Sequence, residues 1–146
     1  MAVLVDTSLL VYRVDPRFPA KQAIATRVLR EGIERGACHI PHQALLEFVA
    51  VVTQPQKGAP PLLSEADAWR EAEDLLAIGT VLYPTEAVVR TALRGAAVYR
   101  LSWFDAHLWA YAECFGLSEI YSEDFQHGRL YGTVRAINPF LKHPAA

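Results

Sequence analysis

The chain has 146 residues, a formal net charge of −2, and a composition that is 52% hydrophobic and 21% charged. This balance favours one globular domain over a disordered chain, and the slightly acidic charge excludes a protein that holds nucleic acid by overall positive charge. No apolar run approaches the ~18 residues of a membrane span, and the N-terminus lacks the pattern of a signal peptide, so we expect a cytoplasmic protein with no membrane partner.

The N-terminal part of the sequence alternates short apolar runs with amphipathic segments. Four apolar residues at 2–5 predict a buried strand that ends at Asp6, and apolar residues at three- and four-residue spacing predict the helices. In chain order we expect a strand at 2–5, a short helix or turn at 9–12, a helix at 19–35, a strand at 38–40 and a helix from 41 to 54.

The same alternation continues after a loop that is rich in proline and glycine. We expect this loop at 54–63, helices at 64–79, 85–98 and 102–116, strands at 81–83, 120–121 and 133–137, and a second loop at 122–128. Alternating strands and helices are typical of βαβ units, so we expect an α/β fold with a mainly parallel sheet covered on both faces.

Four carboxylates stand where a site would form. Asp6 and Asp124 follow predicted strands, Glu47 lies in an otherwise apolar helix, and Asp105 opens a helix after Ser102. Each also has a structural explanation: Asp6 or Thr7 as a helix cap, Glu47 on a solvent-facing stripe, Asp105 in a capping arrangement, and Asp124 in a turn.

Taken together, the four acids indicate a metal site. Two carboxylates ~4 Å apart repel each other by about 4 kcal/mol at an effective dielectric constant near 20, so a cluster needs protons or a cation. Oxygen ligands of this kind suit Mg²⁺ or Mn²⁺, which can activate water against a phosphodiester.

The ordered set of acids resembles the PIN domain family, and within it the VapC-type toxins of toxin–antitoxin pairs. The residues that carry the resemblance are Asp6 after the first strand and the segments LLEF (45–48), SWFDA (102–106) and YSEDF (121–125). It implies a Rossmann-like PIN domain over residues 1–140, with 141–146 as a short C-terminal tail. It also implies a Mg²⁺- or Mn²⁺-dependent endoribonuclease that is often a homodimer.

The resemblance also implies roles for individual residues. Asp6, Glu47 and Asp105 would hold the metal, and Asp124 would complete the site directly or through water, although Glu123 stands beside it and is the other candidate. Ser122 matches a hydroxyl residue that the family often carries before its last acid, and Thr7 or Ser8 would orient Asp6. A VapC-type toxin implies a small antitoxin that covers the acidic groove.

Further side chains have open interpretations. We expect Arg13 and Arg17 to steer the backbone of an RNA substrate, whereas the ordinary alternative is a solvated helix surface. Aromatic residues on the helix from 102 could stack bases, but the same stripe suits the core or a dimer interface. They are Trp103, Phe104, Trp109 and Tyr111.

Two other functions remain open from the sequence. One is a PIN-like module that binds RNA or protein without turnover. The other is a phosphohydrolase with Asp6 as nucleophile, although such enzymes often have a second Asp two residues on, where this chain has Ser8.

Overall fold

Six short strands form one sheet in the computed structural model, which describes residues 2–141. The sheet order is β3-β2-β1-β4-β6-β5, and every neighbouring pair is parallel except β5 and β6. The expected mainly parallel sheet is therefore confirmed. The strands are β1 (Val3–Val5), β2 (Cys38–Pro41), β3 (Thr80–Leu82), β4 (Glu119–Tyr121), β5 (Leu130–Tyr131) and β6 (Val134–Ile137).

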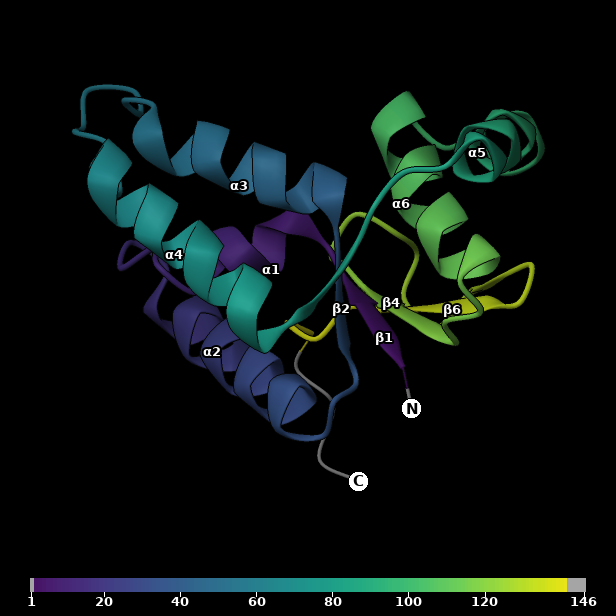
Figure 1. The fold of residues 1–146 in the computed structure, drawn as a ribbon, viewed down its shortest axis with the longest axis horizontal. Coiled ribbons are helices and arrows are strands. Elements are labelled where there is room, and N and C mark those ends of the chain that lie inside the picture. The colour runs from purple at the N-terminus through teal and green to yellow at the C-terminus, as the bar shows by residue number, and fades with distance from the viewer. Residues whose placement is uncertain (1, 142–146) are drawn as a thin grey trace.

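Helices cover both faces of this sheet (Figure 1). Leu4 packs into a core with α5 and α6, whereas the next residue, Val5, packs into a second core with α1 to α4, because successive strand side chains point to opposite faces. The helices are α1 (Thr7–Tyr12), α2 (Pro19–Glu34), α3 (His42–Thr53), α4 (Glu65–Ile78), α5 (Glu86–Tyr99) and α6 (Trp103–Cys114).

Hydroxyl side chains fix the starts of three helices. Ser64, Thr85 and Ser102 each accept a hydrogen bond from the backbone N–H three residues further on, at 3.1, 3.3 and 3.2 Å. These bonds satisfy N–H groups that have no partner inside the helix. The predicted starts of these helices are confirmed to within one residue.

The sequence analysis differs from the structure at several places. Helix α1 begins at Thr7, two residues earlier than expected, and β3 covers Thr80–Leu82 and excludes Tyr83. Strand β5 was not expected, because its two residues are too few to show an alternating pattern, and it pairs antiparallel with β6. Of the predicted tail, residues 142–146 lie outside the described part of the chain.

Helices α5 and α6 pack closely because a glycine faces an indole. A Cβ atom added to Gly95 would collide with the ring of Trp109, so only glycine lets the two helices approach this far. The Trp109 ring is buried and donates from Nε1 to the Tyr131 carbonyl at 2.9 Å. Tyr111 is also buried, whereas Trp103 and Phe104 are exposed, so the aromatic stripe divides between core and surface.

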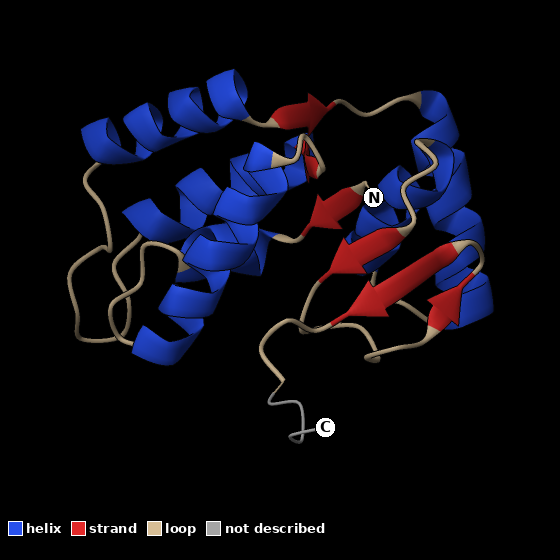
Figure 2. Ribbon diagram, turned by 90° about the horizontal axis from the view of Figure 1, so that it is seen from below, coloured by secondary structure: helices blue, strands red, loops and turns tan. Residues whose placement is uncertain are grey.

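The chain changes direction across the sheet at β1. From β1 it passes through α1 and α2 to β2 on one side, while β4 flanks β1 on the other side. Figure 2 shows neighbouring strands of the sheet running the same way. In open α/β sheets, ligands bind outside the carboxyl ends of the strands at such a reversal. Asp6 follows β1 at this point. Within residues 2–141, no helix has both the length and the apolar character that crossing a bilayer requires.

Candidate active site

Asp6 occupies the N-cap position of α1, but its side chain makes no capping hydrogen bond. Its Oδ2 atom instead accepts a 2.6 Å hydrogen bond from the hydroxyl of Ser122, which follows β4. The residue is only 4% exposed, although a carboxylate is costly to bury. The structure therefore gives Asp6 a partner across the sheet rather than a capping role.

The surroundings of Asp6 favour its neutral form. Burial raises the pKa of Asp6 from 3.8 to about 7, and the hydrogen bond from Ser122 lowers it in part. The negative charges of Asp124 and Asp105 raise it further. Two other acids therefore lie close enough to Asp6 to raise its pKa, as expected for a carboxylate cluster.

Glu47 is held by two donors on the inner side of α3. The Thr7 hydroxyl donates to its Oε2 atom and the Gln43 amide to its Oε1 atom, each at 2.9 Å. Glu47 therefore lies neither on a plain solvent stripe nor unpaired in the core. The sequence analysis expected Thr7 or Ser8 to orient Asp6, whereas the Thr7 hydroxyl is bonded to Glu47.

Asp105 lies in the first turn of α6, where its backbone N–H donates to the Ser102 hydroxyl. Partial burial is the largest cause that raises the pKa of Asp105, and the charges of Asp124 and Glu47 add to it, while Ser102 lowers it. The capping role and the cluster are therefore compatible, because the capping bond comes from the backbone of Asp105 while its side chain lies at the pocket with the other acids.

The two adjacent acids after β4 point to different partners. The Tyr12 hydroxyl donates to Glu123 at 2.6 Å, and Lys21 Nζ forms an ion pair with Glu123 at 2.8 Å. Asp124 instead lines the acidic pocket, and its backbone N–H donates to the Ser122 hydroxyl at 3.1 Å. Glu123 is thus held by Tyr12 and Lys21, whereas Asp124 is exposed and faces the other carboxylates.

The four acids line one pocket of about 390 Å³. They arrive from different elements: Asp6 after β1, Glu47 on α3, Asp105 on α6 and Asp124 in the β4–β5 connection. The expectation that strand ends and helix starts would converge at one edge of the sheet therefore agrees with the geometry.

The two expected substrate-steering arginines separate. Arg13 pairs with Glu71 of α4 at 2.9 Å and is not among the residues that line the acidic pocket. Arg17 does line this pocket, where its guanidinium makes 2.9 and 2.8 Å hydrogen bonds to the buried Asp15. Of these two arginines, Arg17 alone offers a cation at the pocket.

The sequence analysis did not identify the side chains that form hydrogen bonds or ion pairs with the acids Glu47 and Glu123. Gln43 lies four residues before Glu47, a spacing that places both on one helix face, so this partner could have been found. Tyr12 and Lys21 are 111 and 102 positions from Glu123. No local pattern links residues so far apart.

The donor chemistry fits a hard divalent cation. All four side chains offer carboxylate oxygens, and a cation would relieve the mutual repulsion that raises the pKa of Asp6 and Asp105. Among residues 2–141, no three Asp, Glu, His or Cys side chains already stand close enough together to hold a metal ion.

Solved structures of similar fold cover most of the chain. VapC20 of Mycobacterium tuberculosis, described as a toxin that cleaves the sarcin–ricin loop, has a TM-score of 0.66 and 16% identity, over 84% of this chain and 90% of that one. A chain of VapBC2 from Rickettsia felis, bound to a DNA fragment from its promoter, has a TM-score of 0.67 and 10% identity, over 93% and 97%.

A third structure, FitAB bound to an IR36 DNA fragment, has a TM-score of 0.70 and 16% identity, over 97% of this chain and 98% of the matched one. At these identities the likenesses show the fold alone. No curated protein matches the sequence significantly. The model of the PIN domain matches residues 3–132, and with this match over most of its length the chain belongs to the PIN domain family.

Proposed function

We propose that this protein is a divalent-metal-dependent endoribonuclease, and that it is the toxin of a VapBC-type toxin–antitoxin pair. The observation that carries the proposal is the convergence of four acids from distant segments on one pocket. A folded chain gains no stability from mutually repelling carboxylates, one of which, Asp6, is buried, so their convergence favours a role in chemistry.

Asp6, Glu47, Asp105 and Asp124 would hold Mg²⁺ or Mn²⁺ in this proposal. Such an ion supplies an activated water and offsets the charge of a phosphodiester transition state. The chain's own contribution is orientation. Ser122 holds one oxygen of Asp6, and Thr7 and Gln43 hold both oxygens of Glu47, so the carboxylates face the pocket in fixed directions.

Arg17 supports a phosphate-containing substrate. Its backbone N–H and guanidinium both hydrogen-bond to Asp15, which fixes the cation at the pocket despite its exposed position. Arginine suits phosphate because its planar fork matches phosphate oxygens. We therefore retain Arg17 as a candidate for steering RNA and leave out Arg13, which pairs with α4.

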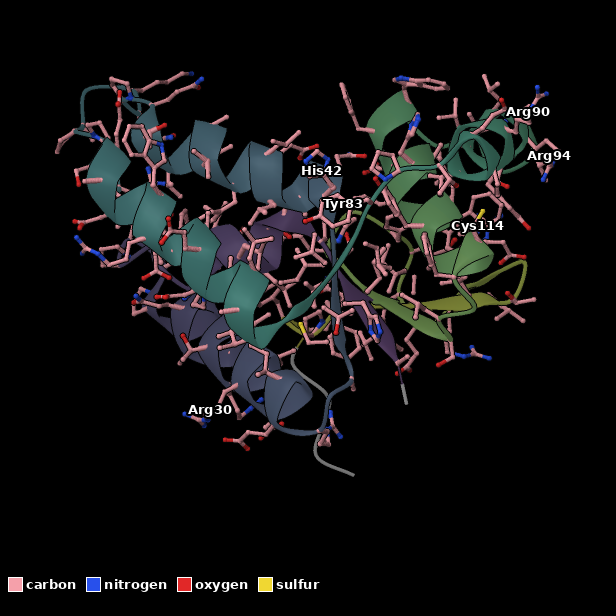
Figure 3. The ribbon with its side chains drawn as sticks, in the orientation of Figure 1. Arg30, His42, Tyr83, Arg90, Arg94 and Cys114 are labelled. Carbon is pink, nitrogen blue, oxygen red and sulfur yellow. The ribbon has the colours of Figure 1, made fainter. Side chains whose placement is uncertain are left out.

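The partner proposals rest on the relatives and on one exposed surface. VapBC2 and FitAB are described as bound to DNA. By analogy with a VapBC-type pair, an antitoxin would cover the acidic groove of this protein with a basic side chain. At the start of α3, His42 meets Tyr83 (Figure 3). A homodimer would bury exposed apolar side chains on α3 and α5. These side chains are Leu46, Val89 and Leu93. We place the protein in the cytoplasm, where both RNA and an antitoxin would be available.

The experiment is RNA cleavage by the purified chain with Mg²⁺ or Mn²⁺, with EDTA and with single-residue variants. Asp105→Asn is expected to abolish cleavage, and EDTA is expected to do the same. Asp74→Asn, an exposed acid on α4, is the matched control and is expected to cleave like the parent. Equal cleavage by parent and Asp105→Asn would refute the proposal.

Two other results would identify the alternatives. RNA binding that EDTA leaves unchanged, without cleavage, would identify a binding module. A phosphoryl group trapped on Asp6 would identify a phosphohydrolase, although the side chain is 4% exposed and its Oδ2 atom is bonded to Ser122.

A further inference from the structure

Two exposed phenylalanines line the same pocket as the four acids. Phe18 is 46% exposed and Phe104 is 65% exposed. A single exposed apolar side chain is ordinary on a protein surface, but two aromatic rings beside one cluster of carboxylates are a specific arrangement. The core does not use these rings, and the acids do not need them for metal binding.

The two rings come from different segments. Phe18 lies in the connection between α1 and α2, beyond the end of α1, whereas Phe104 lies in the first turn of α6. In Figure 1 this connection and α6 lie on different sides of the start of α1, which directly follows Asp6. The pocket therefore has an aromatic residue from each of two segments, together with acids that follow β1 or lie on α3 and α6.

The Phe18 ring is held by its neighbours, and Phe104 is held through its backbone. The Tyr12 ring meets the Phe18 ring edge to face, with 5.7 Å between centroids and 82° between planes. The guanidinium carbon of Arg17 is 5.6 Å from the centroid of Phe18. On the other segment, the Gln43 amide that holds Glu47 also lies 3.4 Å from the Phe104 carbonyl. The Phe18 ring and the Phe104 backbone are thus each held by residues that also line the pocket.

We propose that Phe18 and Phe104 form a stacking subsite that takes unpaired nucleotides on either side of the bond to be cleaved, with Arg17 beside Phe18 as the contact for a backbone phosphate. This inference rests on the proposed function and names the kind of RNA it takes. Unpaired bases stack on aromatic side chains, and an arginine beside the aromatic ring adds a further contact to the nucleic acid. A pocket of about 390 Å³ is within the size range of small-ligand sites.

The subsite would select against paired RNA. Bases in a duplex are already stacked on each other and cannot reach two separated rings without being unpaired, which costs free energy. The specificity would therefore follow the unpaired state of two nucleotides rather than their sequence, because every base presents a flat face to an aromatic ring.

The test measures RNA binding by the full chain, in an Asp105→Asn background that keeps the probe intact. The probes are a fluorescent RNA of 12 randomised, unpaired nucleotides and a paired RNA of the same length, both with Mg²⁺, followed by fluorescence anisotropy. Phe18→Leu and Phe104→Leu are each expected to weaken binding of the unpaired probe about tenfold. Phe18→Trp is expected to keep it.

Phe115→Leu is the matched control. Phe115 is 41% exposed and directly follows the last residue of α6, at the opposite end of the helix from Phe104. It is expected to bind the unpaired probe like the background protein. Melting temperatures of all variants are expected to stay close to that of the background, because the replaced rings are exposed.

Several results would overturn the subsite. They are binding within twofold of the background in both leucine variants, an equal loss in Phe115→Leu, or equal affinity for the paired probe. A changed oligomeric state in Phe104→Leu with unaltered RNA binding would assign that ring to a protein contact and would also overturn it.

Cleavage by the parent protein is scored separately. Loss of binding in the leucine variants without any cleavage by the parent would overturn the nuclease proposal and leave the subsite standing. Cleavage by the parent with unaltered binding in the variants would overturn the subsite alone. Absence of RNA binding in the background protein would overturn both.

Discussion

Replacing Asp6 by asparagine should stabilise the metal-free protein at neutral pH. Asparagine keeps the shape of the side chain and can still accept the hydrogen bond from Ser122, but it carries no charge. In the parent, burial raises the pKa of Asp6 to about 7, so the folded state holds a proton that the unfolded chain releases above pH 3.8. Stability therefore falls as pH rises through this window.

The magnitude follows from the pKa of Asp6. A rise from 3.8 to about 7 corresponds to at most about 4 kcal/mol of lost stability above pH 7, at about 1.4 kcal/mol per pKa unit. Between pH 5 and pH 8 the loss grows by about 2–3 kcal/mol. Because both proteins carry the same remaining acids, the difference between Asp6→Asn and the parent isolates this effect.

The assay is urea unfolding of both proteins in EDTA at pH 5 and pH 8. Asp6→Asn is expected to gain stability over the parent, and the gain is expected to be larger at pH 8. Adding Mn²⁺ at pH 8 should stabilise the parent and reduce the difference, because binding to the folded state alone raises stability. A difference that is the same at both pH values, or an asparagine variant that is less stable at pH 8, would refute the reasoning.

Three further predictions follow from the site and the core. Asp124→Asn should weaken Mn²⁺ binding measured by calorimetry at least tenfold, whereas Glu123→Gln should change it little; the reverse order would reassign the fourth acid. Arg17→Gln should lower the salt dependence of single-stranded RNA binding by about 0.7 in the logarithmic slope. Arg94 of α5 is labelled in Figure 3 and does not line the acidic pocket, so Arg94→Ala should leave this slope unchanged. Gly95→Ala should lower the free energy of unfolding by about 1–3 kcal/mol through collision with the indole on α6, and an unchanged melting temperature would contradict that packing.

Local patterns predicted most of the fold because each element carries its own signal. Hydroxyl residues such as Ser102 marked helix starts, and short apolar runs marked the central strands. Strand β5 was not predicted because Leu130–Tyr131 is defined as a strand only by its pairing with β6. The end of β3 shifted because its pairing with β2, not the apolar character of Tyr83, decides which residues belong to the strand.

The acids were predictable, and most of their partners were not. Strand ends and helix starts converge at one edge of a parallel sheet, which is why Asp6 and Asp105 could be placed together from the sequence. The sequence assigned the Thr7 hydroxyl to Asp6, and only the packing of α3 beside α1 gives it Glu47 as its partner. Glu123 and Asp124 are neighbours in sequence, and the positions of Tyr12 and Lys21 separate their roles.

The bond between Ser122 and Asp6 has a consequence for how the protein is made. These residues are 116 positions apart, and Asp124 follows two residues after Ser122. At ~5–20 residues per second, a ribosome needs roughly 6–23 s after Asp6 to add Ser122. A growing chain therefore has no complete pocket until most of it has been translated, and any product truncated before residue 122 lacks both the hydroxyl that orients Asp6 and the last acid.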